Sequence, residues 1–147
     1  MVASSPQGLF IKSCLSIFVA NNKTLSTLLK KHGVFRTPAA FKHTKSLADG
    51  YVSEAMNMGE GWLLTAEMLE LIEQGVNNVI CTQPFGCLQN HIVGRGMMKT
   101  IKEKNPQSNI VSIDYDPSAT RVNQENRIKL MLSNAKKEMQ EKALQEA

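Results

Sequence analysis

The sequence predicts an α/β fold built on a parallel sheet, and two observations carry that prediction. Short β-branched runs at Val76–Cys81 and Ile110–Ile113 are predicted strands. Segments with apolar residues at helical spacing precede, separate and follow the two runs. The order helix, strand, helix, strand, helix is typical of a parallel sheet with right-handed crossovers. We expect part of a Rossmann-like or flavodoxin-like core.

The first third of the chain carries weaker signals. Residues 1–8 are predicted to be irregular. The apolar stretch Leu9–Ala20 fits either a buried strand or a helix, because periodicity does not separate the two in a short apolar run. Short helices are predicted at Thr24–His32 and at Lys45–Met56, the second interrupted at Gly50.

In the middle of the chain, the residues that start and stop helices and strands are clearer. A flexible entry at Gly59-Glu60-Gly61 leads into a predicted helix, Trp62–Gln74, whose apolar residues recur at helical spacing. Gly75 is a natural stop for that helix. After the first strand and a loop at Pro84–Gly86, Asn90 is expected to cap the crossover helix.

The last helix has a strong predicted start. Asp116 is suited to the N-cap and Pro117 to the first helical position, just after the second strand. The apolar residues of this helix are Ile128, Met131, Leu132, Ala135 and Met139. It ends in a polar tail, and its basic residues Arg121, Arg127 and Lys129 are expected to lie on a solvated face.

Size and charge limit the classes of function. The chain has 147 residues, enough for one domain or for part of a larger one, and its net charge is +4. Residues 1–50 hold seven Lys and Arg against Asp49 alone. This basic segment is either a surface for an acidic partner or phosphate-bearing ligand, or a solvated or docking face. Nucleic-acid binding is not expected, because aromatic residues are few and no binding motif is present.

The cysteines indicate a reducing compartment. Cys14, Cys81 and Cys87 make an odd number, which argues against a disulfide framework. The apolar stretch Leu9–Ala20 contains Lys12 and is too short to span a bilayer, so no membrane contact is expected. We expect a cytoplasmic protein.

The segment from Cys81 to Cys87 is the leading candidate site, because ligands of parallel sheets bind beyond the carboxyl ends of the strands. Cys87 precedes a predicted helix N-terminus, where the helix dipole favours a thiolate. Cys81 ends a predicted buried strand, so it is either a ligand or a small core residue. His91 either completes a ligand set or makes local hydrogen bonds.

Three carboxylates are further candidates. Asp114 and Asp116 follow the second strand, so they are expected at the same sheet edge as the thiols, where they suit a ribose or a metal. Asp116 also has its capping role. Glu60, between two glycines, is suited to acid–base chemistry or to the helix dipole. Phosphate loops of the common types and a Ser/His/Asp set are not found in the sequence.

Several long strings resemble one family. They are Arg36-Thr37-Pro38, Phe41-Lys42-His43-Thr44-Lys45, Met58 to Met68, Cys81-Thr82-Gln83-Pro84-Phe85-Gly86-Cys87-Leu88 with Asn90-His91, Ile113 to Pro117, and Val122 to Arg127. Together they resemble the C-terminal end of the large activase-type proteins related to the 2-hydroxyacyl-CoA dehydratase system of anaerobic bacteria. The resemblance covers residues 24–137, leaving 1–23 unassigned and 138–147 as a polar helical tail.

The resemblance implies an iron–sulfur protein that carries a [4Fe–4S] cluster for low-potential electron transfer. It would make Cys87, and less strongly Cys81, cluster ligands. Glu60, His91, Asp114 and Asp116, singled out above, are candidates for contacts around the ligands or for ligand binding. The family's ATP-hydrolysing part has no counterpart here, so the implied partners are N-terminal activase domains or a dehydratase-type subunit. A homo-oligomer is left open. The alternatives are a cluster-free interaction domain and a structural zinc module.

Overall fold

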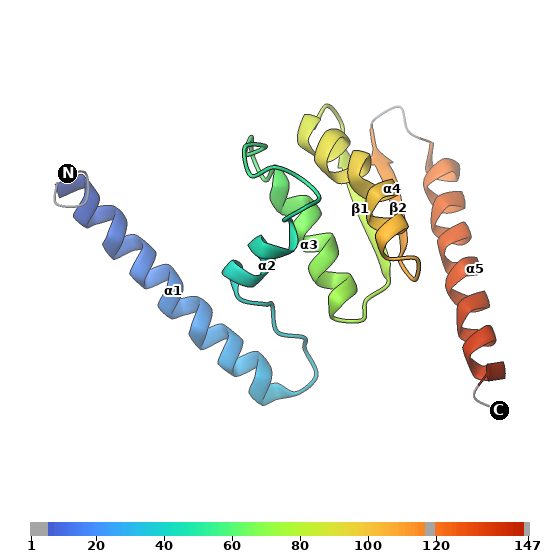
Figure 1. Cartoon of the computed structure of the whole chain (residues 1–147), viewed down its shortest axis with the longest axis horizontal. Coiled ribbons are helices and arrows are strands. Elements are labelled where there is room, and N and C mark those ends of the chain that lie inside the picture. Colours follow the sequence, from blue (N-terminus) through green and yellow to red (C-terminus); the bar gives the residue numbers. More distant parts are fainter. Residues whose placement is uncertain (1–5, 117–119, 146–147) are drawn as a thin grey trace. The chain divides into compact units, whose positions relative to one another are not determined.

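The computed structural model describes residues 6–116 and 120–145 and divides the chain into two compact units, Met1–Ala39 and Ala40–Ala147. Figure 1 shows the elements along the chain. The helices are α1 (Pro6–His32), α2 (Phe41–Leu47), α3 (Trp62–Glu73), α4 (Met98–Lys104) and α5 (Arg121–Gln145); the strands are β1 (Asn78–Pro84) and β2 (Asn109–Tyr115); a π-helical turn, η2 (Asn90–Gly94), and a 3-10 turn, η3 (Arg95–Met97), precede α4.

The first unit contains one helix where two segments were predicted. Helix α1 runs for 27 residues through both Leu9–Ala20 and Thr24–His32, so the first segment is helical and the expected separation is wrong. The polar residues between the apolar segments bond within the helix, because Thr24 Oγ1 donates to Ala20 O at 3.1 Å. Gly33, with φ +73°, follows the last helical residue, His32, which is also where the second predicted helix ends.

The predicted helix Lys45–Met56 is also wrong. The helix there, α2, begins earlier and ends at Leu47. Beyond it the chain turns, with Tyr51 N–H donating to Ala48 O at 3.0 Å and Gly50 at φ +78°. Gly50 therefore ends helical structure at this point, since a positive φ is incompatible with a continuing right-handed helix.

Helix α3 confirms the prediction for Trp62–Gln74 to within one residue. It ends in a Schellman motif, in which Gly75 N–H donates to Ile72 O at 2.9 Å and Val76 N–H donates to Leu71 O at 2.8 Å. Gly75 has φ +82°, as its predicted role as a stop requires.

The two strands are parallel neighbours, as the sequence predicted. Their register pairs Val79 with Ile110 and Gln83 with Asp114. Strand β1, however, begins at Asn78 and continues to Pro84, whereas the predicted strand was Val76–Cys81. Val76 is used by the end of α3, and pairing with β2 continues to Pro84 opposite Tyr115. Cys81 consequently lies in the middle of β1 and not at its end.

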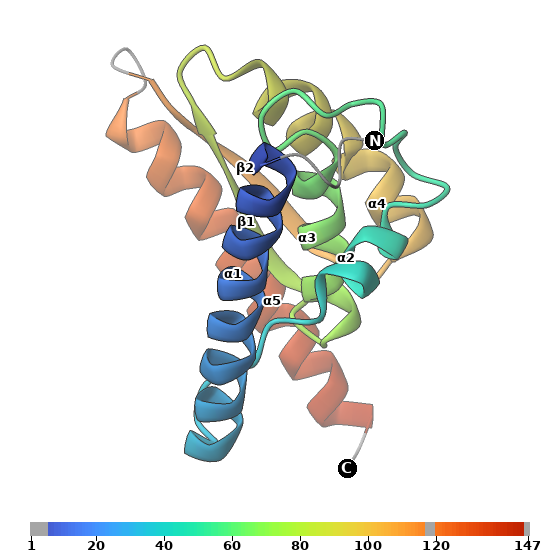
Figure 2. The same cartoon turned by 90° about the vertical axis from the view of Figure 1, so that its left-hand side faces the viewer.

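The core of the second unit lies on one face of this sheet. Met68, Leu69 and Ile72 of α3 pack with Val79, Cys81, Ile101 and Ile110. Helix α5 contacts β2 from the opposite side, and both views show α3 and α4 on one side and α5 on the other (Figures 1 and 2). Residues of β1 alternate strictly between exposed and buried, and Ile80 on its outer face is 44 % exposed. The outer face of β1 is therefore open.

Helix α5 begins at Arg121, so the prediction that Asp116 caps it is wrong. The carbonyl of Thr120 accepts the first hydrogen bonds, from Asn123 N–H at 3.0 Å and Gln124 N–H at 3.4 Å. Pro117, the predicted first helical residue, lies outside the described residues. Within residues 6–116 and 120–145, each helix is too short or too polar to cross a membrane.

Candidate functional site

The thiol-bearing turn joins β1 to the next helical segment. Cys87 N–H donates to Pro84 O at 3.1 Å, and Gly86 between them has φ +67°. The chain is helical from Leu88, and Cys87 O accepts from His91 N–H at 3.3 Å. The turn thus places Cys87 directly before a helix N-terminus, which confirms the sequence prediction.

The Cys87 thiol has polar partners. Asn90 Nδ2 donates to its Sγ at 3.0 Å, and Sγ lies 3.3 Å from Gln89 Oε1. The hydrogen bond from the Asn90 side chain is the main reason that the pKa of Cys87 is lowered, with the Glu60 carboxylate acting against it. Asn90 was predicted to cap the helix. Its side chain stabilises the thiolate instead.

Cys81 has the opposite character. Its side chain is buried in the core on β1, and burial raises the pKa of its thiol. Gln83 Nε2 donates to Cys81 Sγ at 3.1 Å. A Cβ placed on Gly94 would lie 3.1 Å from the same sulfur. Glycine at position 94 therefore lets the helical segment approach β1 closely, where a larger residue would press on the Cys81 sulfur.

The segment Asn90–Gly94 is a π-helix, a form that occurs often at functional sites. Thr65 Oγ1 on α3 donates to Val93 O at 2.7 Å and anchors this turn to α3. Beneath it, Gln83 is 1 % exposed and its Oε1 has no hydrogen-bond partner among the described residues. Sequence reasoning missed Gln83, and only its place two residues after Cys81 on the same strand face could have signalled it.

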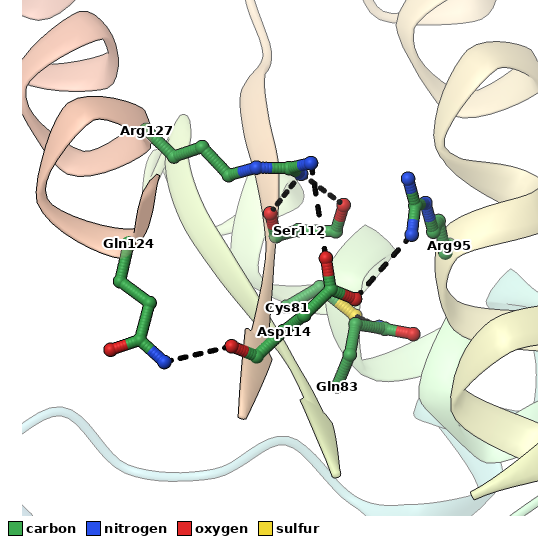
Figure 3. A network of polar contacts seen from close by, with 7 residues as sticks. All are labelled: Cys81, Gln83, Arg95, Ser112, Asp114, Gln124 and Arg127. Carbon is green, nitrogen blue, oxygen red and sulfur yellow. Dashed lines mark hydrogen bonds and ion pairs between the residues drawn. The ribbon is translucent and has the colours of Figure 1, made fainter. Parts of the chain in front are cut away.

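Asp114 lies at the centre of a polar network at the carboxyl end of β2 (Figure 3). Its carboxylate lies 3.4 Å from Arg95 NH1 and 3.8 Å from Arg127 NH2. Arg127 also donates to Ser112 O at 2.8 Å, and Gln124 donates to Asp114 O at 2.9 Å. Arg127 was predicted to lie on a solvated face; it instead connects α5 to β2. The network therefore has a structural role, because it joins η3, β2 and α5.

The remaining predicted residues lie in different settings. Glu60 and His91 are exposed, and Asp116 is half-buried beyond the end of β2. Parallel pairing places the ends of both strands at one edge, as expected. The close partners of the Cys87 thiol are Gln89 and Asn90, whereas those of the Asp114 carboxylate are arginines.

An apolar pocket of about 190 Å³ adjoins the thiol turn. Its lining includes Met56, Met58, Leu88 and Ile92. The loop before α3 reaches the turn directly, since a Cβ on Gly59 would lie 2.7 Å from Gln89 Nε2. The loop before α3 therefore lies against the side chain of Gln89.

The donor atoms near the turn do not complete a metal site. In the part of the chain that the structure describes, no group of three or more His, Cys, Asp or Glu side chains is arranged to hold a metal ion. Cys87 is half-buried and has a lowered thiol pKa, whereas Cys81 is buried and has a raised one. The described residues at the turn therefore offer one thiolate, fewer donors than a complete cluster or zinc site uses. Comparisons with family models, curated proteins and solved structures found no match.

The hydrogen bond from Asn90 predicts that Cys87 is alkylated at lower pH than it would be without Asn90. In a Cys14→Ser chain, iodoacetamide should modify Cys87 before Cys81, because the pKa of Cys87 is lowered and that of Cys81 raised. Asn90→Ala should move the pH profile of Cys87 alkylation to higher pH. Asn126→Ala, an exposed asparagine on α5, is the control and should leave the profile unchanged. An unchanged profile in Asn90→Ala would contradict the assigned role.

Proposed function

We propose that this chain is an accessory domain of an iron–sulfur protein of the 2-hydroxyacyl-CoA dehydratase activase type. Its role is to present Cys87 as one thiolate ligand of a cluster that another polypeptide completes. The observation that carries the ligand role is the Cys87 thiol, with its lowered pKa and the hydrogen bond from Asn90. The sequence resemblance supports the family. A bound [4Fe–4S] cluster would supply low-potential electron transfer.

The residues of this chain hold and orient the thiolate. The Pro84–Cys87 turn positions Cys87, and Asn90 stabilises its charged form. Cys81 is a weaker candidate, because its thiol is buried and its pKa is raised. Its contact with Gln83 supports a packing role, with ligation only after rearrangement of the strand.

Exposed apolar side chains around the turn support a docking surface next to the thiol. Phe85 is 72 % exposed, and Leu88 and Ile92 are also exposed. A polypeptide that covers these side chains would bring its own ligands close to Cys87 and exclude water from the cluster. Charged residues are absent from this group, so apolar contact dominates it.

The open face of β1 supports a larger sheet. Parallel sheets are covered on both faces in most proteins, and a sheet of two strands is rarely stable alone. The described sheet has two strands, and Ile80 and Thr82 on the outer face of β1 are exposed. We therefore include in the proposal that β1 and β2 belong to a Rossmann-like or flavodoxin-like sheet completed by a neighbouring polypeptide.

Anaerobic reconstitution with ferrous iron and sulfide tests the ligand role. The full chain should take up iron in a substoichiometric amount, Cys87→Ala should abolish the uptake, and Cys81→Ala should reduce it at most partly. Cys14→Ala is the control, because Cys14 lies on α1 and not in the second unit. Iron content and visible absorbance are the measurements.

Two outcomes would overturn the proposal. One is the same iron content and absorbance in Cys87→Ala as in the parent. The other is a parent chain that takes up no iron. In the latter case, the cluster-free interaction domain would be the better description, and reconstitution with zinc alone would separate it from a structural zinc module.

A further inference from the structure

Helix α1 carries a heptad pattern that the proposed function does not use. Six residues follow one another at alternating spacings of four and three, and all but Asn22 are apolar: Ile11, Leu15, Phe18, Asn22, Leu25 and Leu29. In heptad terms Leu15, Asn22 and Leu29 take the a positions, and Ile11, Phe18 and Leu25 take the d positions. A repeat of 3.5 residues is the period of a left-handed coiled coil.

This seam is uncovered in the single chain. Ile11 is 62 % exposed, Leu15 59 %, Phe18 66 % and Leu25 56 %. Large apolar side chains at such exposure along one stripe mark an interaction surface. Asn22 interrupts the stripe at its centre, and its Oδ1 accepts from Ser26 Oγ at 3.4 Å.

The residues beside the seam of α1 allow a second copy as the partner. Lys23, Lys30 and Lys31 take the b and c positions, which lie away from a coiled-coil seam. The five flanking e and g positions from Cys14 to Leu28 hold neutral side chains that do not oppose self-pairing: Cys14, Val19, Asn21, Ser26 and Leu28. Lys12, at the preceding e position, is the single charge beside the seam.

We propose that α1 pairs with α1 of a second copy of this chain in a parallel, two-stranded coiled coil, with Asn22 facing its counterpart across the seam. Leucine at a and isoleucine at d by themselves permit three or four strands. A single asparagine at an a position selects two strands in register, because each amide then finds a partner in the other chain. The proposal does not depend on the iron–sulfur assignment.

The mass of the full chain in solution tests this surface. Sedimentation equilibrium over a concentration series should give a dimer, twice the 16.3 kDa of one chain. Phe18→Asp, at a d position, should give a monomer. Ile17→Asp is the matched control, because Ile17 is 63 % exposed but takes a c position outside the seam. A parent chain that is monomeric at all concentrations would overturn the proposal, as would a dimer that survives Phe18→Asp.

A second pair of variants tests the role of Asn22. Asn22→Leu should produce species larger than a dimer, because the residue that selects two strands is lost. Asn21→Leu makes the same change one residue earlier, at a g position, and should leave the dimer intact. A uniform dimer in Asn22→Leu would contradict the assigned register.

Oxidative cross-linking tests the parallel orientation. In a chain with all three cysteines replaced by serine, and first shown to remain dimeric, Phe18→Cys should form a disulfide between copies, since d positions face each other in a parallel pair. Ser16→Cys, at a b position, should not. Equal cross-linking by both variants would overturn the parallel arrangement.

Discussion

Replacing Gly61 by alanine is expected to destabilise the chain by about 3 kcal/mol or more. Gly61 has φ +49° and ψ −126°, a conformation that favours glycine. A Cβ there would lie 2.0 Å from Met56 O and 2.9 Å from Met56 C. Trp62 N–H donates to the same carbonyl at 2.8 Å, so the loop does not yield without losing that bond. Urea unfolding of the full chain measures the loss in free energy.

Gly50→Ala is the control for this variant. Gly50 also has a positive φ, +78°, but a Cβ there would meet nothing within 4 Å. Its replacement should cost about 1 kcal/mol, the strain of the backbone alone. Equal losses for the two variants would show that the close approach of Met56 is not the cause.

Ile101→Ala is expected to cost about 3 kcal/mol, because it empties space in the centre of the core. Ile101 is 0 % exposed and packs with residues of α3, β1 and β2. Ile80→Ala deletes the same atoms from the outer face of β1, where the side chain is 44 % exposed. That variant should cost roughly 1 kcal/mol or less.

Comparing the stability losses of Ile101→Ala and Ile80→Ala also tests whether the outer face of β1 is open. Denaturant unfolding of both variants at equal protein concentration gives the two free energies. If Ile80→Ala costs as much as Ile101→Ala in the isolated chain, the outer face of β1 is covered. The proposed larger sheet would then lose its structural support.

Local signals in the sequence determined the elements whose ends are marked by glycine, proline or capping residues. Helix α3 was predictable because glycines flank it and its apolar residues recur at helical spacing. The parallel pairing of β1 and β2 followed from the order of elements, since a helical crossover joins strands that run the same way. Cys87 before a helix N-terminus followed from the Pro–Gly turn.

Tertiary structure decided the features that depend on distant partners. Strand β1 continues past Cys81 to Pro84 because β2 offers pairing partners up to Tyr115, and no local residue pattern reports that length. Asn90 bonds to the Cys87 sulfur and not to the helix end, a choice that depends on the shape of the turn.

The contacts of Arg127 and the burial of Gln83 were likewise decided by tertiary neighbours. In the sequence, Arg127 is one of several basic residues of a helix, yet α5 packs where Arg127 reaches Ser112 and Asp114 of β2. Gln83 is buried because the π-helical turn packs back onto its face of β1, where Gly94 comes close to its side chain. Hydrogen bonds and burial of this kind are set by three-dimensional neighbours, whereas helix ends and strand order are set by adjacent residues.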